Sequence, residues 1–118
     1  MACLGSCPWR SSGWYEGSMA TFLVVLHRSG PAWQPALESD VQTAWPEHAA
    51  FMDALVDSGF IVLGGPLADE YRVVMVVEAD SEDDARAVLA QDPWSGSHLV
   101  LVSLEPWNLR LDSRTRTR

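Results

Sequence analysis

Four short, nearly unbroken apolar runs restrict the fold of this chain more than any other feature of its sequence. They span residues 21–28, 60–63, 72–77 and 98–104 and are rich in valine, leucine and other apolar residues. Runs of this length between turn residues are typical of β-strands. Because polar and apolar residues do not alternate along them, they predict strands that are covered on both faces of a sheet.

Two helical segments are predicted between these runs from the spacing of their apolar residues. The first spans residues 38–57 and is interrupted by Pro46, so we expect a corner at Trp45 and a main helix that begins at Pro46. The second begins after Ser81, which is suited to cap its N-terminus, and ends at residues 92–94. Strands and helices therefore follow one another in the order β-α-β-β-α-β.

That order predicts an α+β fold of the ferredoxin-like βαββαβ type, with a four-stranded antiparallel sheet. Right-handed crossovers place both helices on one face of this sheet. We expect Gly64-Gly65-Pro66 to end the second strand before a short hairpin link. The face without helices would expose more apolar surface than a soluble monomer usually tolerates. We therefore expect a homodimer in which two sheets pack face to face and close into an α/β-barrel.

The charge of the chain excludes several classes of partner. Its 118 residues are enough for one domain, and the formal net charge is -8, with arginine as the only basic residue besides histidine. An acidic domain repels phosphate backbones and anionic lipids, so we expect no nucleic-acid and no membrane partner. The sequence also contains no apolar segment long enough to cross a bilayer. These properties predict a cytoplasmic protein.

The two ends of the sequence differ in composition from its centre. Residues 1–18 are predicted to be a disordered extension, residues 19–111 the folded domain, and residues 112–118 a mobile tail, with Met19 as the expected natural start. Cys3 and Cys7 are the only cysteines, and no further cysteine or histidine lies near them to complete a zinc site. We therefore expect neither a metal nor a cofactor.

His48 is the most notable titratable residue in the predicted helices. It shares an apolar stripe with Met52 and Leu55, at positions i, i+4 and i+7, so its imidazole is expected on the core side of the helix. Such a ring is either a structural histidine at the edge of the core or a base that faces a cavity.

An ordered set of short motifs resembles the YCII-related (YciI-like) family over residues 20–111. Its pieces are a Trp-x-x-His-Ala-x-Phe-Met segment, a Leu-x-x-x-Gly, a Gly-Gly-Pro-Leu, an Asp-Pro-Trp and a Glu-Pro-Trp, beginning at Trp45, Leu55, Gly64, Asp92 and Glu105. The resemblance implies a dimeric α/β-barrel of the kind also seen in muconolactone isomerase and antibiotic-biosynthesis monooxygenase relatives. It further implies a His–Asp pair as the candidate active site, which is His48 and Asp92 in this chain. One relative in that family is a cofactor-independent dehydrochlorinase of a chlorinated hydroxyquinol.

The residues around this pair predict a pocket for a flat, phenolic or lactone-like substrate. Its candidate lining residues are Trp45, Met52, Gly64, Gly65 and Trp94. Structural alternatives remain for each, because aromatic residues fill cores and a Gly-Gly-Pro run commonly ends a strand. Three weaker candidates have alternatives of their own. Arg28 and Arg72 are candidates to bind a substrate carboxylate, with surface pairing to an acidic residue as the alternative, and His27 either reaches the same cavity or faces solvent. His98 begins a strand and has no predicted partner.

Two functions are therefore predicted as alternatives. In the first, the chain is a small cofactor-free isomerase, lyase or dehydrohalogenase in which His48 transfers a proton and Asp92 orients it. A carboxylate bound to one ring nitrogen fixes the tautomer and favours proton uptake at the other. In the second, the chain is a non-catalytic homodimer that binds a small molecule or serves as an accessory module. Activity that survives the loss of both side chains would exclude a catalytic pair.

Overall fold

The computed structural model of the chain describes residues 19–115. The predicted extension over residues 1–18, with both cysteines, and residues 116–118 of the predicted tail lie outside the described residues. The elements in chain order are β1 (Ala20–His27), the 3-10 turn η1 (Ser39–Val41), α1 (Trp45–Ser58), β2 (Ile61–Pro66), β3 (Arg72–Ala79), α2 (Glu82–Leu89), β4 (Val100–Pro106) and the 3-10 turn η2 (Ser113–Thr115).

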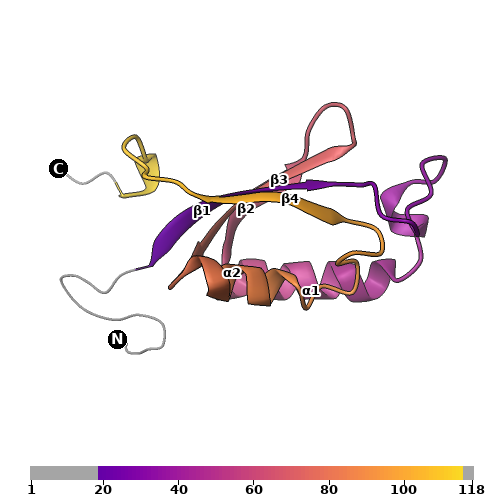
Figure 1. Cartoon of the computed structure of the whole chain (residues 1–118), viewed down its shortest axis with the longest axis horizontal. Helices are drawn as coiled ribbons and strands as arrows, with labels where there is room; N and C mark the ends of the chain where they lie inside the picture. Colours follow the sequence, from indigo (N-terminus) through magenta and orange to yellow (C-terminus); the bar gives the residue numbers. More distant parts are fainter. Residues whose placement is uncertain (1–18, 116–118) are drawn as a thin grey trace.

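The four strands form one antiparallel sheet in the order β2-β3-β1-β4. Both helices lie against the same face of this sheet, as Figure 1 shows. The order of elements, the strand order and the two-layer arrangement confirm the predicted ferredoxin-like α+β fold.

The core lies between the helices and the sheet face that they cover. Alternate residues of the two central strands point into it, among them Val24 of β1 and Val77 of β3, which are completely buried. Ala85 and Leu89 give α2 its buried stripe. The N-terminus of α2 is capped as predicted, because the Ser81 hydroxyl accepts a hydrogen bond from the backbone N–H of Asp84.

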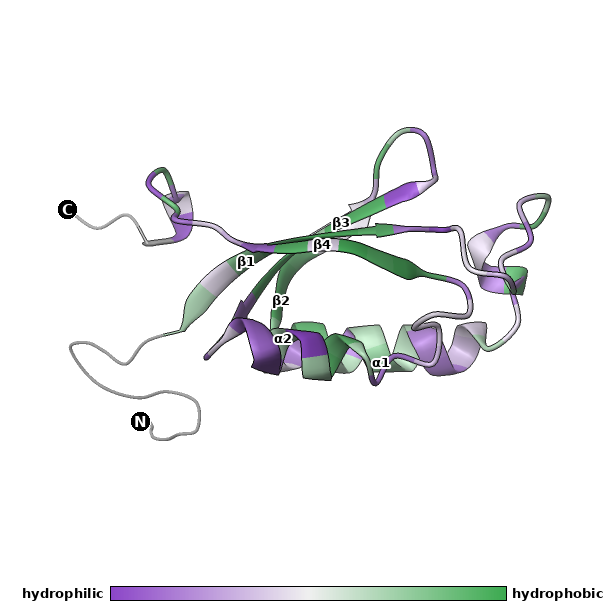
Figure 2. Ribbon diagram, viewed as in Figure 1, coloured by the Kyte–Doolittle hydropathy of each residue, from purple (hydrophilic) through white to green (hydrophobic). Residues whose placement is uncertain are grey.

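The opposite face of the sheet is apolar, and neither helix of the described residues lies over it. Leu23, Leu63 and Val76 lie side by side across three strands on this face, and Leu63 is 61% exposed. Figure 2 shows that apolar residues continue along all four strands, whereas the helices carry polar residues on their outer sides. One copy of the chain therefore covers only one of the two apolar faces that its strands present.

The first helix begins one residue earlier than the sequence predicts. The corner lies at Ala44, whose φ of 59° is left-handed, and α1 starts at Trp45 with Pro46 in its first turn. Proline is tolerated there because the first N–H groups of a helix have no intrahelical acceptor. The predicted interruption is present, but the residues before the corner form only the short turn η1 and not a helix that continues from residue 38.

The prediction that Gly64-Gly65-Pro66 ends the second strand is wrong. These residues belong to β2 and pair with Met75, Val74 and Val73 of β3. The run is compatible with a strand because β2 is the edge of the sheet, where the missing N–H of a proline costs no ladder bond.

Candidate functional site

His48 and Asp92 come from opposite ends of the chain's two helices and meet beside the core. His48 lies in the first turn of α1, and Asp92 lies in the turn that follows α2. Their side chains are joined by a bond of 2.8 Å between Nδ1 of His48 and Oδ1 of Asp92. Only 11% of the histidine side chain and 4% of the aspartate side chain are exposed. The pair is therefore largely shielded from solvent.

The hydrogen bonds of Asp92 determine which nitrogen of His48 is available. Oδ1 of Asp92 also accepts a bond of 2.9 Å from the backbone N–H of Trp94, which fixes the carboxylate within its own turn. Because an ionised carboxylate only accepts hydrogen bonds, Nδ1 of His48 must be the donor. In the neutral ring this leaves Nε2 with its lone pair, and no group among residues 19–115 bonds to that atom.

Trp94 holds the imidazole of His48 in a stack of aromatic rings. The rings of His48 and Trp94 are nearly parallel, at 7°, with centroids 4.0 Å apart. The other face of the indole stacks on His98 at 4.7 Å, and its Nε1–H donates to the carbonyl of Thr43 at 2.8 Å. Trp94 is only 2% exposed, so a buried indole ring separates the two histidines.

His98 is a buried member of this stack that the sequence did not reveal. Its two ring nitrogens contact the hydroxyls of Ser97 and Thr43, each at 2.9 Å. Burial lowers the pKa of His98 from its ordinary value of 6.5, and a positive charge on His48 acts in the same direction whenever that ring is protonated. The lowered pKa favours the neutral form of His98. Its proximity in sequence to the Asp-Pro-Trp motif was the only available signal.

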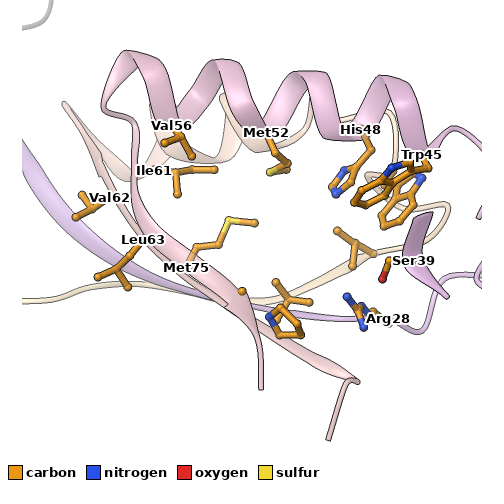
Figure 3. Close-up of a pocket in the computed structure, with 16 residues that line it drawn as sticks. Arg28, Ser39, Trp45, His48, Met52, Val56, Ile61, Val62, Leu63 and Met75 are labelled. Atoms are coloured by element: carbon orange, nitrogen blue, oxygen red, sulfur yellow. The ribbon is translucent and has the colours of Figure 1, made fainter. Parts of the chain in front are cut away.

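A cavity of about 440 Å³ opens beside Trp45, His48 and Met52 of α1. Figure 3 shows Trp45 and His48 at one end of its helical wall, with Arg28 and Ser39 below them. Valine, isoleucine, leucine and methionine side chains occupy the other end. The cavity is therefore an apolar hollow with a few polar groups gathered at one end.

The structure brings the predicted pocket residues together around this cavity. Its lining includes His48 and all five predicted pocket residues, which are Trp45, Met52, Gly64, Gly65 and Trp94. Gly64 suits the close approach of β2 to β3, because a Cβ there would make tight contacts, 3.0 Å from Cγ of Met75 and 3.1 Å from the carbonyl oxygen of Val74. Asp92 does not line the cavity and reaches it only through His48.

Of the three weaker candidates, one lies at the cavity and two lie outside it. Arg28 lines the cavity and also pairs with Glu70. His27 packs on the ring of Tyr71, with centroids 4.7 Å apart, and Arg72 forms an ion pair with Asp69 in the hairpin. Neither His27 nor Arg72 lines the cavity.

A comparison with protein-family models identifies the chain. The model of the YCII-related domain matches residues 21–108. The chain belongs to the YCII-related family. The match begins in β1 and ends just after β4, so it includes both members of the His48–Asp92 pair. A search of curated proteins and a search of solved structures gave no significant match.

Two further findings concern metals and membranes. Within residues 19–115, no three histidine, cysteine, aspartate or glutamate side chains are close enough together to hold a metal ion. In the same part of the chain, neither helix has the length and apolar character that a membrane span requires.

Proposed function

We propose that this YCII-related chain is a small enzyme in which His48 transfers a proton on a small substrate and Asp92 orients the ring. The proposal invokes no cofactor. The observation that carries it is the buried bond from Nδ1 of His48 to Asp92, which leaves Nε2 of a cavity-lining ring as a base.

The proposed reaction begins with the movement of a proton from the substrate to Nε2 of His48. The electron pair of the broken C–H or O–H bond stays on the substrate, and the ring becomes an imidazolium. The Asp92 carboxylate and the stacked face of Trp94 both stabilise that cation. Return of the proton to a different atom gives an isomerase, and loss of a neighbouring leaving group with the electron pair gives a lyase or dehydrohalogenase.

The cavity limits the substrate to a small and mainly apolar molecule. Its volume of about 440 Å³ is within the range of about 300–1,000 Å³ that is usual for small-molecule pockets. Trp45 offers a flat wall beside His48, which suits a planar ring such as that of a phenol or lactone. The apolar walls also strengthen the attraction between the imidazolium and any developing negative charge.

Exchange of carbon-bound hydrogen for deuterium would test this proposal without knowledge of the natural substrate. A library of small carbon acids is incubated in D₂O with the full chain, and NMR follows the loss of each C–H signal. We expect exchange of at least one compound with the unaltered chain and its loss in His48→Ala. In Asp92→Asn we expect a rate reduced by about 10²-fold or more, within the usual contribution of a general base.

His27→Ala is the matched control, because His27 lies outside the cavity. Its exchange rate should equal that of the unaltered chain. Exchange that persists in both His48→Ala and Asp92→Asn would contradict the proposal. If compounds bind in the cavity but none exchanges, the alternative of a non-catalytic binding module is favoured.

We also propose that the chain is a homodimer in which the open faces of two sheets pack together. The support is the uncovered apolar face that includes Leu23, Leu63 and Val76. Analytical ultracentrifugation at micromolar concentration should give the mass of a dimer, and Leu63→Asp should give a monomer. Val56→Asp is the control, because Val56 is 53% exposed but lies on α1. A monomeric unaltered chain would contradict the proposal.

A further inference from the structure

The charges around the cavity differ from those of the whole chain. The chain has a formal net charge of -8, yet no aspartate or glutamate among residues 19–115 lines the cavity. Within the same part of the chain, Arg28 is the only lining residue with a permanent charge. A chain of this net charge repels anions in general. The cavity differs, because its lining contains an arginine and no carboxylate, so the charge of its lining favours an anion.

Arg28 is buried but only partly bonded. Its side chain is 10% exposed, and its guanidinium carbon lies 4.9 Å from the centre of the Trp33 ring. Nη1 donates to the backbone carbonyl of Glu70 at 2.8 Å and to the Glu70 carboxylate at 3.2 Å. Nε is buried and has no hydrogen-bond partner among the described residues. A buried donor without an acceptor costs about 1–3 kcal/mol, and more when it is charged.

A purely structural role explains only part of this arrangement. The bonds to Glu70 tie the end of β1 to the hairpin between β2 and β3. The hairpin itself is well fixed, because the backbone N–H groups of Arg72 and Tyr71 bond to the Asp69 carboxylate and lower the pKa of Asp69 to about 2. Such a clamp uses Nη1 and leaves Nε without an acceptor. The Glu70 carboxylate is 72% exposed, so it offsets the arginine charge weakly.

We infer that the cavity takes a small apolar acid whose carboxylate, or a similar planar anion, binds to Arg28. Glu70 accepts bonds only from Nη1 of Arg28, and a guanidinium can match the two oxygens of a carboxylate with its remaining N–H groups. The apolar body of the acid would lie between the tryptophans and the methionine side chains. Figure 3 shows Arg28 across the cavity from His48 and Trp45, so the acid would extend from the arginine towards the histidine.

The inferred substrate class deepens the proposed function and rests on it in one respect. If the acid presents its ionisable C–H to Nε2 of His48, the proton passes to the ring and the electron pair stays on the substrate. The substrate then carries an additional negative charge, which Arg28 stabilises more strongly than it stabilises the ground state. Binding of the acid itself requires no proton transfer, so binding and catalysis can be tested separately.

The test compares acids with neutral amides of the same shape. Benzoate and phenylacetate are titrated against benzamide and phenylacetamide by calorimetry at low salt, with the chain at full length. In the unaltered chain we expect the acids to bind about tenfold or more tightly than the amides. In Arg28→Met, which keeps an unbranched apolar stem, the ratio should fall to about one. In Arg28→Lys it should be intermediate, because an ammonium cannot form the paired contact.

Arg72→Met is the matched control, because Arg72 forms an ion pair in the same hairpin but lies outside the cavity. It should retain the full preference for acids. Equal binding of acids and amides by the unaltered chain, or no binding of either acid, would overturn the inference. So would a preference that survives in Arg28→Met. If that variant does not fold, Arg28→Lys and the weakening of the acid preference by added salt decide the question.

One additional variant separates this inference from the proposed function. His48→Gln removes the base but leaves Arg28 in place, so its preference for acids should remain. Acids that bind by way of Arg28 without any deuterium exchange would contradict the proton-transfer proposal alone. Exchange that depends on His48 and shows no preference for acids would contradict this inference alone.

Discussion

Replacement of Trp94 by phenylalanine tests whether the ring stack is central to the stability of the site. The indole is 2% exposed and stacks on both His48 and His98. Its Nε1–H bonds to the carbonyl of Thr43. A phenyl ring can keep part of the stacking, but it cannot form this hydrogen bond and it does not fill the same volume. Trp94→Phe therefore removes only part of the contacts of the stack, so we expect the variant to fold.

The expected cost of Trp94→Phe has three parts. Loss of the hydrogen bond to Thr43 costs about 1 kcal/mol. Loss of the apolar area of the larger ring costs about 1 kcal/mol. The cavity left beside His98 costs about 1 kcal/mol more, because the surrounding side chains relax only in part. The free energy of unfolding should therefore fall by about 3 kcal/mol.

Urea unfolding followed by far-ultraviolet circular dichroism measures this change, since the signal does not depend on the tryptophan that is removed. All variants are compared at one protein concentration, because association would make the apparent stability depend on it. Trp107→Phe is the control, with a ring that is 44% exposed and an expected change within about 0.5 kcal/mol. A loss below about 1 kcal/mol for Trp94→Phe would refute the reasoning.

Two further changes test the packing and the charge state around the stack. Gly30→Ala should destabilise the chain by about 2–3 kcal/mol in urea, because its Cβ would collide with the backbone carbonyl of Ser97. Gly65→Ala, whose Cβ meets no atom within 4 Å, should change stability by less than about 0.5 kcal/mol, and equal effects would contradict the packing argument. Because burial lowers the pKa of His98, the unfolded state binds more protons than the native state below pH 6.5, so stability should decrease as the pH falls through that region. Urea midpoints at pH 7.5 and 5.5 should differ less in His98→Gln than in the unaltered chain, and an identical difference would contradict the lowered pKa.

The fold was predictable because its signals are local and repeated. Four apolar runs and two periodic segments determine the order of elements, and that order allows few topologies. The ends of the strands and helices were less predictable where the same residues are compatible with two structures. A Gly-Gly-Pro run commonly ends a strand, but it is also compatible with an edge strand. Only the position of β2 at the edge of the sheet distinguishes the two cases for Gly64-Gly65-Pro66.

The motifs predicted two polar residues of the site directly, whereas Arg28 was only a weaker candidate and His98 had no predicted partner. His48 and Asp92 stand in recognisable segments of the YCII-related family, whereas Arg28 and His98 do not. Arg28 follows an apolar strand, where an arginine usually points into solvent. Its burial depends on Trp33 in the next loop and on Glu70 in a hairpin 42 residues away. No local pattern contains that information.

His98 was missed for a similar reason. The loop between α2 and β4 folds back on itself, and the carbonyl of Trp94 accepts bonds from the backbone N–H groups of Ser97, His98 and Leu99. This turn places His98 against the indole before the strand begins at Val100. The sequence shows only a histidine at the start of an apolar run, which predicts a strand residue of no particular function.

Backbone strain in the described part of the chain adjoins two polar residues at one end of the cavity, His48 and Arg28. Among residues 19–115, only two non-glycine residues have a positive φ: Ala44 at 59° and Glu70 at 60°. The carbonyl of Ala44 accepts the backbone N–H of His48, and the carbonyl of Glu70 accepts Nη1 of Arg28. Left-handed backbone costs about 1–2 kcal/mol in a residue with a Cβ, and such strain persists where surrounding contacts impose it. One strained residue thus fixes the backbone of the proposed base and the other fixes the proposed anion-binding arginine. Two independent distortions, each bonded to one of two polar residues that face each other across one end of the cavity, are better explained by a requirement on the positions of these side chains than by the stability of the fold.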